Sequence, residues 1–270
     1  MLRSIKDLEH YAIQATDGDI GHVSDFYFDD NSWVVRYLLV DSGGWFSNRT
    51  VLISPISIGR SNRDEKVLAV SLTKEKIKNS PDLDTNKPVS RQYEMGYLGY
   101  YGYPYYWNGG GLWGPGAFPN LMLTGIAESN ALEECDKRIV ERTRDISELE
   151  SSQASDPHLR SCNEVMGYHF EATDGDIGHV KGFLVEEETW AIRYIIVETS
   201  NWWLGHQVLI VPQWISNVNW FDNTVSVELT RQAVKDAPPY DSTVHLDREW
   251  EEGIYKHYDR HGYWTNQLCQ

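Results

Sequence analysis

Apolar and polar residues alternate in several short stretches near the start of the chain. The alternation runs through residues 11–15, breaks at the sequence Thr16-Asp17-Gly18-Asp19, and resumes over residues 20–28. A period of two is typical of half-buried strands, and Asp-Gly is favoured in tight hairpin turns. The pattern therefore predicts a β-hairpin, with Gly21 marking a bulge in its second strand.

Further short elements follow this hairpin. The run from Trp33 to Val40 is too apolar for a strand with one face in water, so it predicts a central strand. Thr73 to Ser80 predicts a helical turn, with Thr73 as its N-cap and Pro81 ending it. Closely spaced strands in so small a unit favour a mainly β fold, a small antiparallel barrel. The remaining predicted strands are residues 51–54, 56–58 and 66–71.

The whole pattern occurs twice. Ala15 to Val23 recurs letter for letter at Ala172 to Val180, an offset of 157 residues that holds without insertion or deletion. A unit this long indicates a duplicated domain rather than a solenoid or propeller repeat. The sequence thus predicts two barrels in tandem. The predicted segments are a first barrel at 2–107, a glycine-rich linker with a short helix at 108–158, and a second barrel at 159–264.

Composition narrows the partners. The formal charge of −16 opposes attraction to phosphate backbones, so we expect no nucleic acid partner. No stretch has the 18 or so continuous apolar residues of a membrane span, and no signal-peptide core follows Met1. We therefore expect a cytoplasmic protein without direct membrane insertion. The three cysteines form no duplicated pair, which predicts neither a disulfide framework nor a zinc site, and we expect no cofactor.

Aromatic residues concentrate after each barrel and in one loop of each copy. The extensions need a surface, which is their own barrel, the sister barrel or a partner chain, because Tyr and Trp suit half-wet contacts. The paired loop aromatics either anchor a neighbour or cover the barrel end. We expect a homo-oligomer, a dimer. The predicted interface residues are Trp45, Phe46, Tyr106 and Trp107 in the first copy and Trp202, Trp203, Tyr263 and Trp264 in the second.

The duplicated D-G-D-I-G-H turns, the W-x-x-R-Y core strands and the tails ending in Tyr-Trp resemble the PRC-barrel family. The resemblance covers both copies, and it implies two small antiparallel barrels with short helical turns and aromatic C-terminal extensions. That family includes the cytoplasmic domain of the photosynthetic reaction-centre H subunit, the C-terminal domain of a ribosome maturation factor, and many stand-alone bacterial proteins. The chain looks most similar to the last group, with two barrels in tandem. The H subunit carries an N-terminal membrane helix that this chain lacks, and the ribosome factor carries a different N-terminal domain where this chain has another copy, so neither role is carried over intact.

Two carboxylates and an imidazole recur in both turns. Such a set holds a divalent cation or moves protons near neutral pH, which would make the turns a metal- or proton-responsive sensor. Asp-Gly-Asp is also what a hairpin turn requires, and strand alternation separates the second Asp from the His unless a bulge re-aims one of them. The candidate ligands are Asp17, Asp19, His22, Asp174, Asp176 and His179.

Arg36 and Arg193 lie inside apolar strands, where a lone charge is costly. The nearby candidate partners are Asp41 and Glu198, Asp25, the tail acids Glu94 and Glu251, or a ring such as Tyr37. A structural ion pair or stack is one interpretation, and an anion-binding arginine is the other. We assign structural roles to Arg36, Arg193, Trp33, Trp190, Gly18 and Gly175.

No nucleophile elbow, phosphate loop, dinucleotide fingerprint or metalloprotease motif occurs. We therefore predict a non-catalytic scaffold or binding module with an unidentified protein partner. One alternative, implied by the H-subunit resemblance, is an accessory to membrane-bound photosynthetic or respiratory electron or proton transfer, in contact with a membrane protein complex. The other is the sensor at the Asp-Gly-Asp turns.

Overall fold

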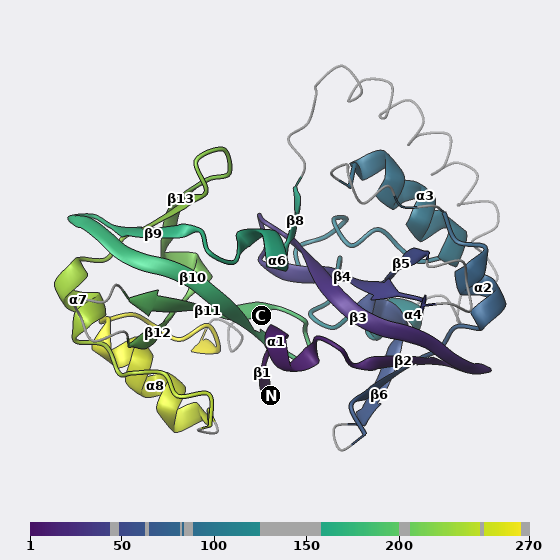
Figure 1. The fold of residues 1–270 in the computed structure, drawn as a ribbon, viewed down its shortest axis with the longest axis horizontal. Coiled ribbons are helices and arrows are strands. Elements are labelled where there is room, and N and C mark those ends of the chain that lie inside the picture. Colours follow the sequence, from purple (N-terminus) through teal and green to yellow (C-terminus); the bar gives the residue numbers. More distant parts are fainter. Residues whose placement is uncertain are drawn as a thin grey trace. The chain divides into compact units, whose positions relative to one another are not determined.

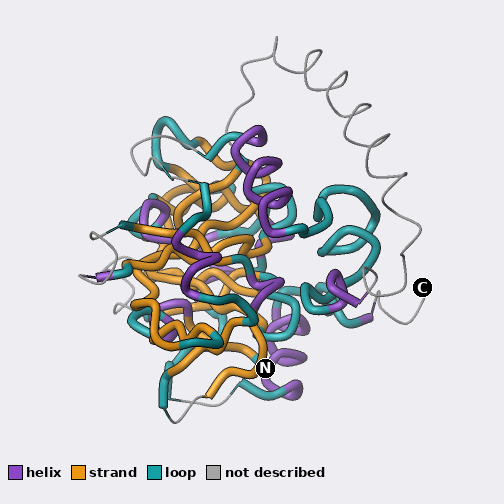
Figure 2. The backbone as a smooth tube through the Cα atoms, turned by 90° about the vertical axis from the view of Figure 1, so that its right-hand side faces the viewer, coloured by secondary structure: helices purple, strands orange, loops and turns teal. Residues whose placement is uncertain are grey.

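Strands dominate the computed structural model, as Figure 2 shows in orange. It describes residues 1–43, 49–62, 65–81, 83, 89–124, 158–199, 206–243 and 246–265. The expected mainly β class is confirmed, because these residues form two sheets of seven described strands each. Within the same residues, no helix has the length and apolar character needed to cross a membrane.

The sheet built mainly from the first copy has the order β5-β4-β3-β2-β7-β6, with β8 paired to the far part of β3 (Figure 1). Its long strand β3 pairs with β2 on one side and with β4 on the other. The strands are β2 (Ala12–Ala15), β3 (Gly18–Asp29), β4 (Val34–Asp41), β5 (Thr50–Ile53), β6 (Ile58–Asn62), β7 (Val67–Val70) and β8 (Leu159–Ser161).

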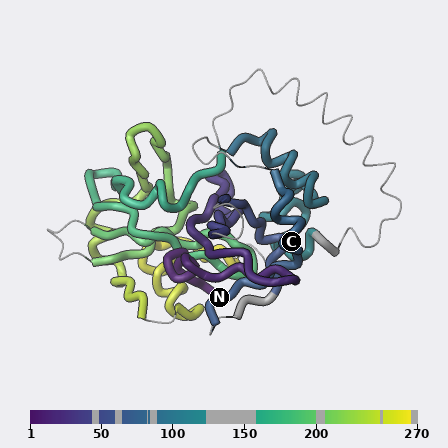
Figure 3. The backbone as a smooth tube through the Cα atoms, turned by 45° about the vertical axis from the view of Figure 1, so that its right-hand side comes forward, coloured from purple at the N-terminus to yellow at the C-terminus, as the bar shows by residue number. Residues whose placement is uncertain are grey.

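The other sheet repeats this order as β12-β11-β10-β9-β14-β13, with β1 paired to β10. Its hairpin β9–β10 begins 157 residues after β2–β3, as the offset between the two sequence copies requires. Figure 3, coloured by residue number, shows the two sets of strands in purple to blue and in green shades. The strands are β1 (Leu2–Ser4), β9 (His169–Ala172), β10 (Gly175–Glu186), β11 (Ile192–Thr199), β12 (Gln207–Ile210), β13 (Ile215–Asn219) and β14 (Thr224–Val227).

The predicted hairpin and its bulge are both present. Ile13 lies opposite Gly21 while Gln14 lies opposite Asp19, so Ile20 is the extra residue of β3. Gly21 is required there because a Cβ atom would lie 1.9 Å from the carbonyl oxygen of Asp41. The bulge lets the backbone of β3 approach β4 this closely.

Three details differ from the expected antiparallel barrel. β2 pairs in parallel with β7, and β9 pairs in parallel with β14. The predicted strand at 56–58 is instead the 3-10 turn η2 (Pro55–Ser57), which Pro55 favours by fixing its own backbone; η4 (Pro212–Trp214) repeats it. Within the described residues, the hydrogen-bonded path of neither sheet returns to its first strand.

Helices occupy the ends of each repeat. The predicted turns are α2 (Lys74–Lys78), capped by Thr73, and α7 (Arg231–Lys235), capped by Thr230. The aromatic extensions form α3 (Arg91–Tyr101) and α8 (Arg248–His257), which the sequence pattern did not reveal. The remaining helices are α1 (Ile5–Leu8), α4 (Leu121–Thr124) and α6 (Cys162–Val165).

The compact units do not coincide with the sequence copies. Unit 1 comprises residues 1–6, 162–186 and 192–270, and unit 2 comprises residues 7–161 and 187–191. Each unit therefore contains a strand from the other copy. In unit 1, Leu2 of β1 lies opposite Glu186 of β10, and in unit 2, Leu159 of β8 lies opposite Asp29 of β3.

The glycine-rich part of the predicted linker, residues 109–119, packs into unit 2. Trp113 is buried at its centre, and its Nε1 donates to the carbonyl oxygen of Thr189 at 2.7 Å. A Cβ atom on Gly109 or Gly111 would lie within 2.5 Å of the backbone of Gly114 or Gly116. These glycines permit close backbone contact. The short helix predicted within 108–158 around Asn130 to Leu149 lies outside the described residues.

Candidate functional site

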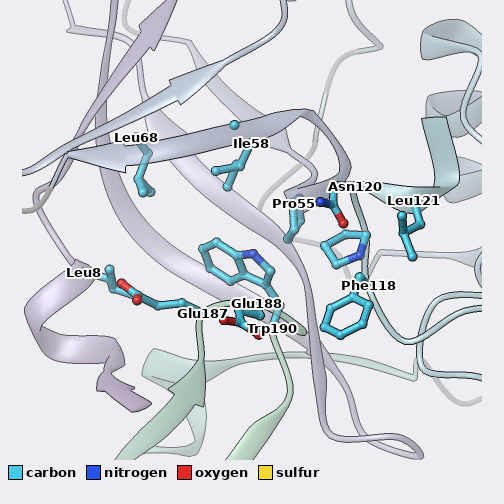
Figure 4. A pocket seen from close by; sticks show the side chains of 12 residues that line it. Leu8, Pro55, Ile58, Leu68, Phe118, Asn120, Leu121, Glu187, Glu188 and Trp190 are labelled. Carbon is cyan, nitrogen blue, oxygen red and sulfur yellow. The ribbon is translucent and has the colours of Figure 1, made fainter. Parts of the chain in front are cut away.

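Unit 2 contains a pocket of about 590 Å³ whose wall is mainly apolar. Figure 4 shows the indole of Trp190 at its centre, with Ile58 and Leu68 on one side of it and Phe118 on another. The volume lies in the range of small-ligand sites. The lining residues are Leu8, Pro55, Ile58, Gly59, Leu68, Phe118, Pro119, Asn120, Leu121, Glu187, Glu188 and Trp190.

Local backbone geometry positions Trp190. It has a φ of 58°, a left-handed conformation that a bulky residue rarely adopts. Its carbonyl oxygen accepts a hydrogen bond from the amide of Val35 at 2.9 Å, and Ala191 forms a bridge with Val34. Together with the bond from Trp113 to Thr189, these contacts hold residues 187–191 inside unit 2. The surrounding structure thus imposes the strained conformation.

The rim of the pocket combines exposed apolar surface with negative charge. Phe118 is 37% exposed and Leu121 is 52% exposed, whereas the lining residues Leu8, Leu68 and Trp190 are buried. Glu187 and Glu188 supply two carboxylates, and the described part of the lining contains no Lys, Arg or His. Apolar side chains that remain exposed next to a hollow are a common feature of binding sites.

A buried glutamate lies elsewhere in unit 2. Glu94 of α3 has no exposed surface, and its Oε1 accepts hydrogen bonds from the hydroxyls of Tyr37 at 3.1 Å and Tyr106 at 2.5 Å. Its Oε2 lies 3.2 Å from Arg91 and 2.7 Å from His158 Nε2. Burial, followed by the charge of Glu94, raises the pKa of Tyr37 and of Tyr106 well above the usual range.

Unit 1 contains the corresponding cluster without the histidine. Glu251 Oε1 accepts from Tyr194 at 2.9 Å and from Tyr263 at 3.0 Å, and its Oε2 pairs with Arg248 at 3.0 Å. The position that matches His158 is occupied by Met1. Each cluster connects the central strand to the aromatic extension of the same repeat. We therefore interpret both clusters as structural contacts that hold the extensions on the sheets.

The arginines of the central strands have partners that the sequence did not suggest. Arg36 lies 3.5 Å from Asp29, and its guanidinium donates to Ser32 and to the carbonyl oxygen of Leu112. Arg193 pairs with Glu186, the residue that corresponds to Asp29, at 2.6 Å.

Each guanidinium also stacks on a tail tyrosine, Arg36 on Tyr106 at 3.9 Å and Arg193 on Tyr263 at 4.1 Å. Both guanidinium groups thus have a carboxylate and a ring as partners, and Arg36 has a backbone carbonyl as well, so the geometry fits a structural role.

The duplicated turns also have a structural explanation. Asp17 Oδ1 accepts from the amide of Lys74 at 2.8 Å, and Asp174 Oδ1 accepts from that of Arg231 at 2.7 Å. Each aspartate therefore caps a short helix, α2 or α7. Among the described residues, no group of three or more His, Cys, Asp or Glu side chains has the geometry of a metal site. The exposed candidates Asp19, His22, Asp176 and His179 lie on β3 and β10.

The predicted aromatic contacts are distributed unevenly. Tyr106 is buried in unit 2, and the half-buried Trp107 stacks on Tyr105. In unit 1, Tyr263 and Trp264 are half-buried and lie near the ring of Tyr255. Trp45, Phe46, Trp202 and Trp203 lie outside the described residues.

The glycines and tryptophans assigned structural roles lie in tight turns. Gly18 and Gly175 have φ values of 131° and 132°, which favour glycine in the hairpins. Trp33 and Trp190 both adopt positive φ, and Trp33 stacks on Phe28 with a centroid distance of 5.1 Å. Among the predicted site residues that the structure describes, Trp190 is the one that lines the pocket.

Sequence reasoning missed the pocket because its parts lie far apart in the chain. Leu8, Leu68, Phe118 and Trp190 come from four separate segments, and Phe118 belongs to a stretch whose glycines suggest a linker. An apolar pair, Phe118 and Leu121, on either side of Pro119-Asn120 was the one local signal.

Comparisons with known proteins agree with the fold. Residues 2–77 match the model of the PRC-barrel domain family. A segment of 82 residues is 37% identical to an uncharacterized protein of Deinococcus radiodurans, and the match covers 30% of this chain and 29% of that protein. Residues 2–77 of this chain are therefore a PRC-barrel domain.

Proposed function

We propose that the chain is a non-catalytic binding module built on two PRC-barrel domains, and that the pocket of unit 2 receives its protein partner. The second domain in this proposal is residues 159–264, which repeat the sequence and the order of elements of residues 2–107. Cytoplasmic location and homodimerisation remain predictions of the sequence.

One observation carries the proposal: two exposed apolar side chains lie at the edge of a pocket that also contains the buried, hydrogen-bonded segment of Trp190. Phe118 and Leu121 are exposed at its rim, and hydrogen bonds hold the segment that contains Trp190. Exposed aromatic and aliphatic anchors around a pocket are typical of protein interfaces. The polar clusters around Glu94 and Glu251 are weaker candidates for a binding site, because their charged groups contact one another and the buried tyrosines.

Site-specific photo-crosslinking in cells tests the proposal. A photoreactive residue replaces Asn120, which lines the pocket, and in a matched control it replaces Phe221, which is 94% exposed in unit 1. We expect a discrete protein adduct from position 120, absent from position 221 and lost when Phe118→Ser and Leu121→Ser are added. Identical adducts from both positions, or an adduct that survives the double substitution, would contradict a pocket-centred function.

A further inference from the structure

We infer that the pocket of unit 2 binds a basic peptide segment, one bulky apolar side chain flanked by Lys or Arg. This inference rests on the proposed function and specifies the chemistry of its partner. It depends on the shape of the pocket, the charge at its edge and the stiffness of its floor.

The size of the pocket permits a bulky apolar side chain to enter. The pocket measures about 590 Å³, and its floor consists of Leu8, Leu68 and Trp190, each of them buried. An apolar side chain that enters removes its own surface and that of Phe118 and Leu121 from water, which stabilises the complex by about 25 cal/mol for each Å² of apolar surface.

The charge selects a basic neighbour. Glu187 and Glu188 are adjacent carboxylates from one segment, and Glu188 is exposed with no hydrogen bond or ion pair to any described residue. Because none of the described residues that line the pocket is a Lys, Arg or His, the carboxylates at its edge would repel an anionic ligand. The chain's formal charge of −16 acts in the same direction at longer range.

The floor is fixed before the ligand arrives. Trp190 is held by the bond from Val35, and Thr189 by the bond from Trp113. A rigid receptor loses little conformational entropy on binding, so a short peptide can retain affinity.

Calorimetric titration of the full chain with three synthetic pentapeptides tests this inference. Their central sequences are Lys-Phe-Lys, Glu-Phe-Glu and Lys-Ser-Lys. We expect the Lys-Phe-Lys peptide to bind with an affinity at least about 10-fold higher than that of either other peptide. Glu188→Gln should weaken it about 3-fold at low salt, an effect that fades as salt screens the charge. The matched control is Glu228→Gln, an exposed glutamate in unit 1.

The apolar half of the inference has its own variants. Phe118→Ser with Leu121→Ser should abolish binding of the Lys-Phe-Lys peptide, whereas Phe221→Ser in unit 1 should leave it unchanged. All of these side chains are exposed, so circular dichroism should show an intact fold. Equal binding of the lysine and glutamate peptides would overturn the assigned charge. Binding of a long-chain alkylammonium but not of the peptide would overturn the peptide chemistry and assign the pocket to a small cationic amphiphile instead.

The crosslinking and calorimetric experiments distinguish a failure of the proposed function from a failure of this inference. If position 120 yields a partner adduct but no basic peptide binds, the peptide chemistry is wrong and the binding module stands. If neither the adduct nor the peptide depends on Phe118 and Leu121, both proposals fall.

Discussion

Gly21 and Gly178 lie where β3 and β10 run close against the backbone of the neighbouring strand. A Cβ atom would lie 1.9 Å from the carbonyl oxygen of Asp41 at the first position and 2.0 Å from that of Glu198 at the second. Both contacts are with backbone, so relief requires the strands to move apart. Neither glycine can therefore be exchanged without disturbing a sheet.

We predict that Gly21→Ala lowers the free energy of unfolding by roughly 2–3 kcal/mol, the usual cost of forcing extra volume into a packed site. Gly96→Ala provides the control, because Gly96 lies in α3 and a Cβ atom added there would meet nothing within 4 Å. That substitution should raise stability by about 0.5–1 kcal/mol through helix propensity. Urea unfolding followed by circular dichroism measures both, and similar midpoints for the two variants would refute the argument.

At the residue scale, the sequence predicted that the buried arginines have partners but did not identify those partners correctly. An arginine in an apolar strand requires a counter-ion, yet Asp29 pairs with Arg36 because the hairpin between β3 and β4 brings the two positions close together. Likewise, the contact of His158 with Glu94 depends on β8 pairing with β3. Such partners follow from strand register, which a single sequence does not specify.

The short helices α2 and α7 show how one element depends on another. Each has its own threonine cap, and each receives a second cap from the aspartate of a distant hairpin turn, Asp17 or Asp174. The duplicated acidic turns thus connect hairpin to helix. This explains why the sequence keeps the first aspartate of both turns without invoking a ligand.

We expect Asp17→Ala and Asp174→Ala each to cost about 1 kcal/mol of stability, the usual value of a lost helix cap, and to be additive because they act in different units. Asp19→Ala, an exposed strand position, should change stability by less than about 0.5 kcal/mol. Thermal melts of the three variants with and without Ca²⁺ provide the measurement. A Ca²⁺-dependent rise in Tm that disappears with Asp17→Ala would instead support the sensor hypothesis.

Among the elements, strands and capped turns were predictable, whereas α3 and α8 were not. Alternation, Asp-Gly and Thr caps act locally, so the sequence displays them directly. The sequence of α3, RQYEMGYLGYY, is rich in glycine and tyrosine, which have poor helix propensity. Packing of Tyr97, Leu98 and Tyr101, which are buried, therefore decides its conformation.

At the scale of the whole molecule, each compact unit is completed by a strand from the other sequence copy. β8 adds Leu159, Arg160 and Ser161 to the edge of β3, where Arg160 pairs with Asp30 at 2.9 Å and Ser161 donates to Asp25. A substitution in one copy should therefore weaken the sheet of the other.

We predict that Leu159→Ala, which truncates a buried side chain, costs about 2–4 kcal/mol and accelerates amide hydrogen exchange in β3 before β10. Leu2→Ala should act on β10 first, by a smaller amount because Leu2 is only partly buried. Hydrogen exchange with mass spectrometry resolves the two strands. If Leu159→Ala accelerated hydrogen exchange in β10 alone, the pairing of β8 with β3 would be wrong.

Buried tyrosines predict a sharp alkaline transition. Burial raises the pKa of Tyr103 to about 12 and that of Tyr263 to about 12, and moves those of Tyr37 and Tyr106 upward as well. These folded pKa values exceed the ordinary value of 10, because the fold favours the neutral phenols. The contribution of these neutral tyrosines to stability is therefore complete below pH 10 and is lost as pH rises toward the folded pKa values.

We therefore expect tyrosinate absorbance at 295 nm to rise together with the loss of the far-ultraviolet circular dichroism signal, both above pH 10. One buried phenol with its pKa raised by two units contributes on the order of 3 kcal/mol to this destabilisation. Gradual ionisation of most tyrosines while the circular dichroism remains native would contradict the packing of the aromatic tails.

The exchanged strands also have a consequence for synthesis on the ribosome. Unit 2 needs residues 159–161 and 187–191, so the first copy emerges with the edge of β3 open and the position of Trp190 empty. It must wait until much of the second copy has been translated before its sheet and its pocket are finished. During that interval, the open edge is exposed to the same strand on a neighbouring nascent chain.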